Sequence, residues 1–252
     1  MRLLAGPFMG EFGWELFAWQ AALRRAALED YEEAYVLCQP GKEVLYEDFA
    51  KVNVIPDALA ADMLNDRATK VCPGNKCLAP YNRHWSRERL HSGGFFNQRF
   101  VKLGRYTEDL GRDVIVHARG RAFRQEDNWP LKNYEAIVGD FVKSGLSVGI
   151  VGLTAHTLPV TVKEGITDLR DRPLREVCDI IASSRLTVGT GSGPIHLASL
   201  CGCAHVVFTP AYNIPRYADH WNPFKTPVSF LAGGTNPTVV DVLETCYKEL
   251  GR

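Results

Sequence analysis

The chain has 252 residues, of which 46% are apolar and 23% charged, so it is neither disordered nor short of material for a packed core. Lysine plus arginine equals aspartate plus glutamate, at 29 each, which gives the whole chain no electrostatic bias toward nucleic acid or membrane. The seven cysteines are scattered, and no secretory signal or membrane-spanning run is visible; we therefore expect a cytoplasmic protein with reduced thiols.

The first part of the chain alternates predicted strands and helices, to judge from the spacing of its apolar residues. Strands are expected over 2–5, 34–38 and 53–55, and helices over 14–28 and 43–52. From Asp66 to Arg105 the periodicity fades and prolines and glycines interrupt the segment, so irregular structure is expected there.

The alternation becomes regular from Asp113 onward. Strands are expected over 114–117, 146–151, 186–189 and 204–208, and helices over 132–143, 174–183, 194–200 and 239–250. Strands separated by helices imply parallel sheets with crossover connections, which bind ligands at the strand ends. The sequence therefore predicts an α/β protein with two Rossmann-like parallel-sheet domains, 1–105 and 106–252, that face a cleft.

The segment 186–200, LTVGTGSGPIHLASL, carries the most specific pattern in the chain. A buried strand runs into a glycine turn, and Pro194 follows near the first turn of a helix, where its missing N–H costs nothing. Glycines let backbone N–H groups approach a ligand, and a helix N-terminus favours an anion. A diphosphate is expected at Thr190, Gly191, Ser192, Gly193 and His196. The alternative is a tight turn in which His196 is merely packed.

Several stretches of the second half form recognisable motifs: Asp168-Leu-Arg, Pro173-Leu174, 180–186 (IIASSRL), 191–199 (GSGPIHLAS), and Asn128-Trp129-Pro130 followed by Tyr134. Together they resemble the donor half of the heptosyltransferase-like glycosyltransferases (family nine). The resemblance extends over about 113–208. It implies the two-domain GT-B fold, with the nucleotide-sugar on the C-terminal half and the acceptor on the N-terminal half. It also places Asp168 among the donor-binding residues and residues 212–222 in a loop near the donor.

The chain departs from this family at one position. The family commonly has an acid immediately before its Ser-Gly-Pro, where this chain has Gly191. The identity of the donor sugar is therefore not carried over.

A second candidate site follows the strand predicted over 114–117, where His117, Arg119, Arg121 and Arg124 lie within eight residues. Guanidinium groups bind phosphate oxygens in a bidentate manner and can balance the charge of a leaving nucleoside diphosphate. We expect His117, Arg119 and Arg124 at the donor. The alternative is a solvated basic loop paired with Glu126 and Asp127.

No metal ion and no cofactor beyond the nucleotide-sugar co-substrate are expected. The family generally works without a bound metal, and the chain has no obvious cage of acidic residues. Cysteines at 72 and 77 and at 201 and 203 could in principle ligate zinc, but the spacing of the second pair is unusual for it.

The turn after the first predicted strand, Gly10-Glu11-Phe12-Gly13-Trp14-Glu15, provides candidate catalytic acids. Family members that resemble this segment have an acid there, followed by a helix with a pattern like Ala22-Leu23-Arg24. The resemblance implies that Glu11 is the general base for the acceptor hydroxyl, with Glu15 in reserve, and that Gly10 and Trp14 contact the acceptor. The alternative is that Glu15 interacts with the helix N-terminus and Glu11 is simply exposed.

A basic segment from Arg67 to Arg105 holds nine Lys or Arg against one acid, interleaved with aromatic residues. This combination is typical of proteins that bind phosphate-bearing or single-stranded polymers. It predicts an anionic acceptor contacted by Arg83 and Trp85. That acceptor is a phosphorylated or lipid-linked saccharide, with peripheral membrane contact, or a hydroxylated base flipped out of DNA. The alternative is a solvated loop whose aromatics fill the core.

The leading functional prediction is a metal-independent, inverting glycosyltransferase that moves a sugar from a nucleotide-sugar to an acceptor hydroxyl. The alternative from another class is a nucleotide- or glycan-binding protein of the same fold without catalysis. A dehydrogenase is disfavoured, because no Gly-x-Gly-x-x-Gly follows the first predicted strand.

Overall fold

The computed structural model describes residues 2–8, 10–56, 98–122, 125–231, 234 and 236–252. The chain divides into two compact units, Met1–Val101 and Lys102–Arg252. Both contain a parallel sheet and helices. Three predicted contact residues, Arg83, Trp85 and Arg124, lie outside the described residues, as does most of the basic segment.

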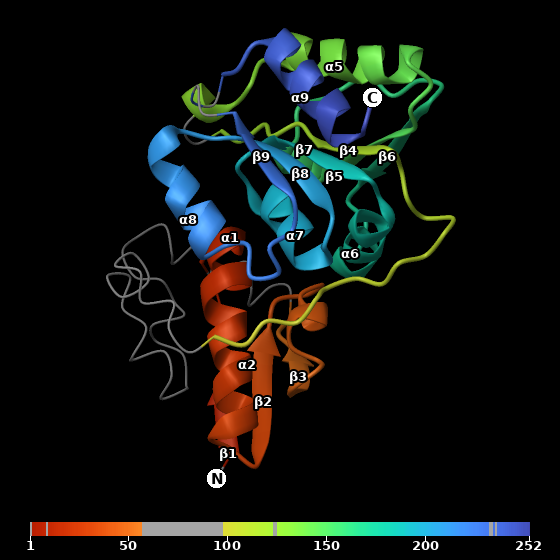
Figure 1. Cartoon of the computed structure of the whole chain (residues 1–252). Coiled ribbons are helices and arrows are strands. Elements are labelled where there is room, and N and C mark those ends of the chain that lie inside the picture. Colours follow the sequence, from red (N-terminus) through yellow and green to blue (C-terminus); the bar gives the residue numbers. More distant parts are fainter. Residues whose placement is uncertain (1, 9, 57–97, 123–124, 232–233, 235) are drawn as a thin grey trace. The chain divides into compact units, whose positions relative to one another are not determined.

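Unit 1 contains a three-stranded parallel sheet in the order β1-β2-β3. The strands are β1 Arg2–Ala5, β2 Glu33–Cys38 and β3 Lys51–Val54. Between β1 and β2 the chain forms α1 Phe12–Trp14, a π-helical turn Glu15–Trp19 and α2 Gln20–Glu29, drawn in red in Figure 1. Apolar residues of this helical stretch, such as Leu16 and Phe17, are completely buried.

Two of the elements predicted for unit 1 need correction. The helix expected over 14–28 begins at Phe12 and contains the π-helical turn, which the apolar spacing does not reveal. The helix expected over 43–52 is wrong, because only a 3₁₀ turn, Glu43–Leu45, forms there. Residues from Lys51 onward instead pair with β2, where Tyr35 lies opposite Lys51. The end of the expected helix therefore belongs to strand β3 instead.

A buried arginine fastens α2 to the turn before β3. Arg24 has no exposed surface, and its Nε and Nη2 donate to the carboxylate of Asp48 at 2.7 and 3.0 Å. The same guanidinium donates to the carbonyls of Leu45 and Arg99, at 3.1 and 3.2 Å, and to Gln20 Oε1. The Arg24 that belongs to the predicted Ala-Leu-Arg pattern is thus a structural residue.

Unit 2 contains a six-stranded parallel sheet in the order β6-β5-β4-β7-β8-β9. The strands are β4 Val114–His117, β5 Val148–Gly152, β6 Ile166–Arg170, β7 Leu186–Thr190, β8 Ala204–Phe208 and β9 Val228–Leu231. This is the 3-2-1-4-5-6 order of a doubly wound fold, in which the direction of winding reverses between β4 and β7. Such folds bind ligands outside the carboxyl ends of the strands at that reversal.

Helices cover both faces of this sheet (Figure 1). Helices α5 Leu131–Lys143 and α9 Val239–Glu249 lie on one face, and α6 Leu174–Ser183 and α7 Gly193–Cys201 on the other. The core under α5 and α9 takes alternate strand residues, such as Val116 and Val188, together with the fully buried Trp129. A short helix, α8 Ile214–Asp219, follows β8. Within the described residues, no helix is long and apolar enough to span a membrane.

Every element predicted for unit 2 is confirmed, with boundaries that differ by two residues at most. Apart from short 3₁₀ turns, two strands and one α-helix of unit 2 were not predicted: β6, β9 and α8. Both strands lie at the edges of the sheet, where fewer side chains are buried. Only Ile166 and Leu169 of β6 are buried, and all four residues of β9 are partly exposed. Their apolar patterns are correspondingly weak.

The first prediction concerns the buried arginine of unit 1. Replacing Arg24 by Leu is expected to lower the free energy of unfolding by about 3 kcal/mol, because it leaves Asp48 and two carbonyls without their donor. The matched control is Arg25→Leu, which removes a partly exposed arginine paired with Glu29 and should change stability by less than about 0.5 kcal/mol. Urea unfolding followed by tryptophan fluorescence measures both, and equal losses would contradict the prediction.

Candidate functional site

The candidate site of unit 2 lies where β4 and β7 end side by side. The two strands pair in parallel, with His117 opposite Gly189. Gly189 has no room for a side chain, because a Cβ there would lie 2.7 Å from the carbonyl oxygen of His117. Since both strands end at the reversal of winding, the segments that follow them meet at the edge where doubly wound folds bind ligands.

The glycine turn after β7 leads directly into α7. Ser192 is the N-cap residue, with extended backbone (φ −159°, ψ 170°), and Pro194 occupies the first turn. The Ser192 hydroxyl does not cap the helix; its Oγ lies 2.7 Å from Nδ1 of His117. The N-cap side chain therefore leaves the first-turn N–H groups of α7 unsatisfied, and the positive end of the helix dipole favours an anion.

Arg119 is a buried cation held by neutral groups. Its side chain is 6% exposed; Nη1 donates to the Gly191 carbonyl at 3.1 Å, and Nη2 donates to the Asp127 carbonyl. The Nε atom is buried and has no partner among the described residues. Burial and the nearby Arg121 lower the pKa of Arg119 from its usual value. A buried charge without a counter-charge costs several kcal/mol, which a bound anion would offset.

The neighbouring carboxylate is already engaged. Asp127 accepts a hydrogen bond from Nη2 of Arg121 at 2.8 Å, so the two form an ion pair within the loop. The alternative expectation, a basic loop whose arginines pair with the acids of the same loop, therefore holds for Arg121. No carboxylate of the described residues forms an ion pair with Arg119. Backbone hydrogen bonds from Leu158 to Ala118 and from Gly120 to His156 hold the chain on both sides of Arg119.

His196 has a partner inside unit 2. Its Nε2 lies 2.9 Å from the hydroxyl of Tyr217, a residue of α8, and the two rings stack with centroids 4.5 Å apart. The Trp221 ring meets His196 edge-on at 4.8 Å. Burial pushes the pKa of His196 well below its usual value, so the imidazole is neutral. This is the packed arrangement that the sequence analysis left open as the alternative, and the contact of His196 with a diphosphate stays a prediction.

Tyr217 also occupies the space beside the glycine turn. A Cβ at Gly191 would lie 2.7 Å from the Tyr217 hydroxyl oxygen. Burial raises the pKa of Tyr217 to about 12, against the opposing effect of Arg216, Arg119 and Arg121. Three arginines thus act on the Tyr217 phenol, and one of them, Arg119, also donates to the carbonyl of Gly191 in the turn.

The other predicted donor residues of unit 2 have different surroundings. Thr190 is buried at the end of β7, and its Oγ1 lies 3.0 Å from the hydroxyl of Tyr134 on α5. Asp168 lies on the edge strand β6, two strands away from β4, and forms a bidentate ion pair with Arg170. That pair, mainly through its hydrogen bonds, lowers the pKa of Asp168. The structure therefore brings Thr190 to the turn but not Asp168.

In unit 1 the two predicted catalytic acids differ sharply. Glu11 is exposed just before α1, and its carboxylate has no partner among the described residues. Glu15 is 2% exposed and accepts hydrogen bonds from the Tyr46 hydroxyl at 2.7 Å and from Lys42 Nζ at 2.8 Å. Glu15 thus has two internal donors in place of the helix N-terminus considered earlier, which leaves Glu11 as the acid available to a ligand.

The remaining residues of this turn frame Glu11. Trp14 is half-buried, and Gly10 packs so closely on Phe8 that a Cβ at Gly10 would lie 2.3 Å from the ring. Gly10 is therefore required by packing, and its predicted contact with an acceptor stays a prediction.

The sequence analysis did not single out Tyr217, although Arg216 beside it lies in the loop assigned near the donor. It named Asp127 as a possible partner of the basic loop, and in the structure the carbonyl of Asp127, rather than its carboxylate, accepts a hydrogen bond from Arg119. A signal for Tyr217 exists in the sequence, since Gly191 stands where the resembling family has an acid and the missing volume has to be filled.

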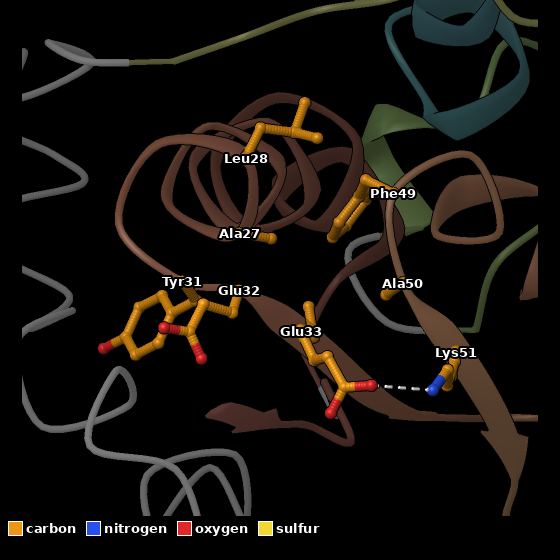
Figure 2. A pocket seen from close by; sticks show the side chains of 9 residues that line it. Ala27, Leu28, Tyr31, Glu32, Glu33, Phe49, Ala50 and Lys51 are labelled. Carbon is orange, nitrogen blue, oxygen red and sulfur yellow. Dashed lines mark hydrogen bonds and ion pairs between the residues drawn. The ribbon is translucent and has the colours of Figure 1, made fainter. Parts of the chain in front are cut away.

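Unit 1 also has an open hollow of about 400 Å³ at the end of its sheet where strands β2 and β3 begin (Figure 2). It lies by the end of α2 and the first residues of β2 and β3, and Glu33 and Lys51 pair across its floor at 3.0 Å. Because strand carboxyl ends bind ligands in parallel sheets, this amino-end hollow is not the expected site.

Neither a protein-family model nor a curated protein sequence matches the chain. Its structure resembles the ADP-heptose LPS heptosyltransferase II of E. coli, with TM-score 0.58, 14% identity, and coverage of 99% of this chain and 98% of the other. It also resembles a family 9 glycosyl transferase from Veillonella parvula, with TM-score 0.60, 11% identity, and coverage of 99% of this chain and 97% of the other. The likeness to the iron-containing glycosyltransferase TibC of enterotoxigenic E. coli has TM-score 0.54 and 15% identity, and covers 92% of this chain and 63% of the other. These likenesses establish a shared fold with heptosyltransferases and family 9 enzymes.

Among the described residues, no group of three or more His, Cys, Asp or Glu side chains is placed to hold a metal ion. Cys201 and Cys203 are buried thiols, and burial raises the pKa of Cys203 to about 11. The cysteines at 72 and 77 lie outside the described residues.

The second prediction tests the contact between Gly191 and Tyr217. Gly191→Ala is expected to lower the free energy of unfolding by about 1–3 kcal/mol through overpacking. The same substitution in a Tyr217→Phe background should cost less than half as much, because the clashing oxygen is gone. The control, Gly139→Ala on the open face of α5, should be neutral or stabilising by up to about 1 kcal/mol. Additive effects in the urea double-mutant cycle would contradict the contact.

Proposed function

We propose that this protein is a metal-independent glycosyltransferase that moves a sugar from a nucleotide-sugar to a hydroxyl group of an anionic acceptor. The observation that carries the proposal is the buried Arg119 guanidinium, which has no carboxylate partner at the reversal of winding. The fold shared with heptosyltransferases and family 9 glycosyltransferases supports the same reaction class.

Unit 2 binds the donor in this proposal. The diphosphate accepts hydrogen bonds from the first-turn N–H groups of α7, from the Ser192 hydroxyl and from Arg119. Negative charge on the leaving nucleoside diphosphate grows as the glycosidic bond breaks. Fixed donors that are already aimed at that position stabilise the transition state without reorganising. The arginines near Tyr217 supply the counter-charge, so the proposal needs no metal ion.

Unit 1 binds the acceptor, and Glu11 acts as the general base. Its exposed carboxylate removes the proton of the acceptor hydroxyl as the oxygen attacks the anomeric carbon, so the displacement inverts that centre. The nine basic residues between Arg67 and Arg105 support an anionic acceptor. Phosphorylated or lipid-linked saccharides and nucleic acids both have that charge.

A second candidate, a nucleotide-binding protein without catalysis, is favoured by one observation. Gly191 stands where the resembling family commonly has an acid, so a side chain that the family has beside its donor site is missing from this chain. The two functions differ in whether a bound donor is ever cleaved.

The third prediction concerns donor binding. Arg119→Gln is expected to weaken binding of a nucleoside diphosphate by about tenfold or more, because one charge-assisted hydrogen bond is lost. Titration calorimetry across the five common nucleoside diphosphates and their sugars measures this. The control is Arg185→Gln, an arginine before the amino end of β7 that pairs with Asp113. Tight binding that is equal in wild type and Arg119→Gln would remove the main support for the proposal.

The fourth prediction separates catalysis from binding. Glu11→Gln should keep the affinity for the nucleotide-sugar within about twofold and lower transfer and acceptor-free donor hydrolysis by about 100-fold, the usual contribution of a general base. The control is Glu29→Gln, an exposed acid at the end of α2. If wild type binds a donor but cleaves none with or without acceptor, the non-catalytic function is correct. If Glu11→Gln turns over normally, Glu11 is not the base.

A further inference from the structure

We propose that His117 is a positioning residue, which donates from Nδ1 to Ser192 Oγ and thereby turns the serine O–H toward the diphosphate of the donor. This inference rests on the proposed function, since it specifies how the donor site of unit 2 binds its anion.

The two side chains come from segments that the fold brings together. His117 is the last residue of β4 and is 4% exposed, and Ser192 follows β7. The distance of 2.7 Å between Nδ1 and Oγ is that of a strong hydrogen bond. Because the hydroxyl does not cap α7, the imidazole is its one hydrogen-bond partner among the described residues.

The direction of this hydrogen bond decides what the serine can do. With the ring proton on Nε2, Nδ1 accepts the serine hydrogen and the oxygen lone pairs face the anion. With the proton on Nδ1, the histidine is the donor and the serine hydrogen is free to point at a phosphate oxygen. The other groups proposed to bind the diphosphate, namely the first-turn N–H groups of α7 and the guanidinium of Arg119, are all donors. With the proton on Nδ1, the Ser192 hydroxyl is also a donor toward the phosphate, as these groups are.

The surroundings of His117 keep its imidazole neutral. A neutral ring has a single hydrogen, on either Nδ1 or Nε2, so both arrangements are chemically possible. The basic side chains that act on it are Arg119, in the segment after β4, and His156, in the loop after β5. Gly152, at the end of β5, lies against the ring, where a Cβ would be 2.9 Å from Cδ2. Burial, Arg119 and His156 together lower the pKa of His117 to about 3, and no carboxylate of the described residues contributes to this shift.

The same surroundings argue against a nucleophilic serine. A histidine activates a serine by taking its proton, which requires a base strength near the working pH. An imidazole with a pKa of about 3 is far too weak for that. The pair is therefore suited to orienting a hydroxyl group, and we expect no covalent intermediate on Ser192.

The test uses the two amide residues that imitate the two ring nitrogens. Asn at 117 places its amide near the position of Nδ1, and Gln places it near that of Nε2. His117→Asn is expected to bind a nucleotide-sugar within about threefold of wild type, and His117→Gln and His117→Ala about tenfold more weakly. In a Ser192→Ala background the three substitutions should have equal effects. The control is His205→Asn, a buried histidine at the amino end of β8, which should leave the affinity unchanged.

Two further measurements separate positioning from a packing role. In ¹⁵N–¹H NMR spectra of the whole chain, the hydrogen of His117 should be on Nδ1. The ratio of wild-type to His117→Ala affinity should be constant between about pH 5 and pH 8, because the ring stays neutral there. A nucleotide-sugar is the ligand for this profile, since its diphosphate lacks the monoester proton that titrates near pH 6.

The outcomes distinguish the inference from the proposed function. If wild type binds none of the nucleoside diphosphates or nucleotide-sugars, the proposed function itself fails. If wild type binds but His117→Asn is as weak as His117→Ala, if the hydrogen is on Nε2, or if the affinity ratio changes across the pH range, donation from Nδ1 is wrong. Labelling of Ser192 by a fluorophosphonate that depends on His117 would also overturn it, by making the serine a nucleophile.

Discussion

The buried positive charge of Arg119 is the constraint around which the carboxyl edge of unit 2 is arranged. Its hydrogen bonds to two backbone carbonyls fix where the guanidinium lies, but carbonyls do not neutralise it. The carboxylate of Asp127, whose charge acts on Arg119, is ion-paired with Arg121. The Arg119 guanidinium therefore has no ion-pair partner of its own among the described residues, at a place where the order of the strands already favours ligand binding. An anion is the ligand that this arrangement suits.

Burial sets the charge of the remaining groups. His117 and His196 are both neutral because desolvation disfavours their imidazolium forms, and Tyr217 stays a phenol because desolvation disfavours its anion. The positive charge of the site thus comes from its arginines, which do not change their protonation across the physiological range. Binding of a diphosphate there is governed by geometry and by salt concentration more than by pH.

The sequence sufficed to predict most of unit 2, because its central strands and its helices have regular apolar spacing. It did not predict β6 and β9, whose exposed edges weaken that spacing, or the loss of the helix at 43–52, which depends on pairing with β2. Within the site, the glycine turn and Arg119 were visible as local patterns. The pairing of His117 with Ser192 and of His196 with Tyr217 was not, because each joins residues far apart in the chain. The internal partners of Glu15 escaped for the same reason.

The close approach of Tyr217 to the turn has an evolutionary consequence. Because the phenol fills the volume that a side chain at position 191 would need, a larger residue at 191 destabilises the protein unless residue 217 changes with it. If an acid replaces Gly191, residue 217 has to be smaller or adopt another rotamer. If Gly191 is kept, a large side chain at 217 is needed to fill the space beside it. The two positions should therefore covary among relatives of this chain, and a redesign of its donor range has to treat them as a single unit.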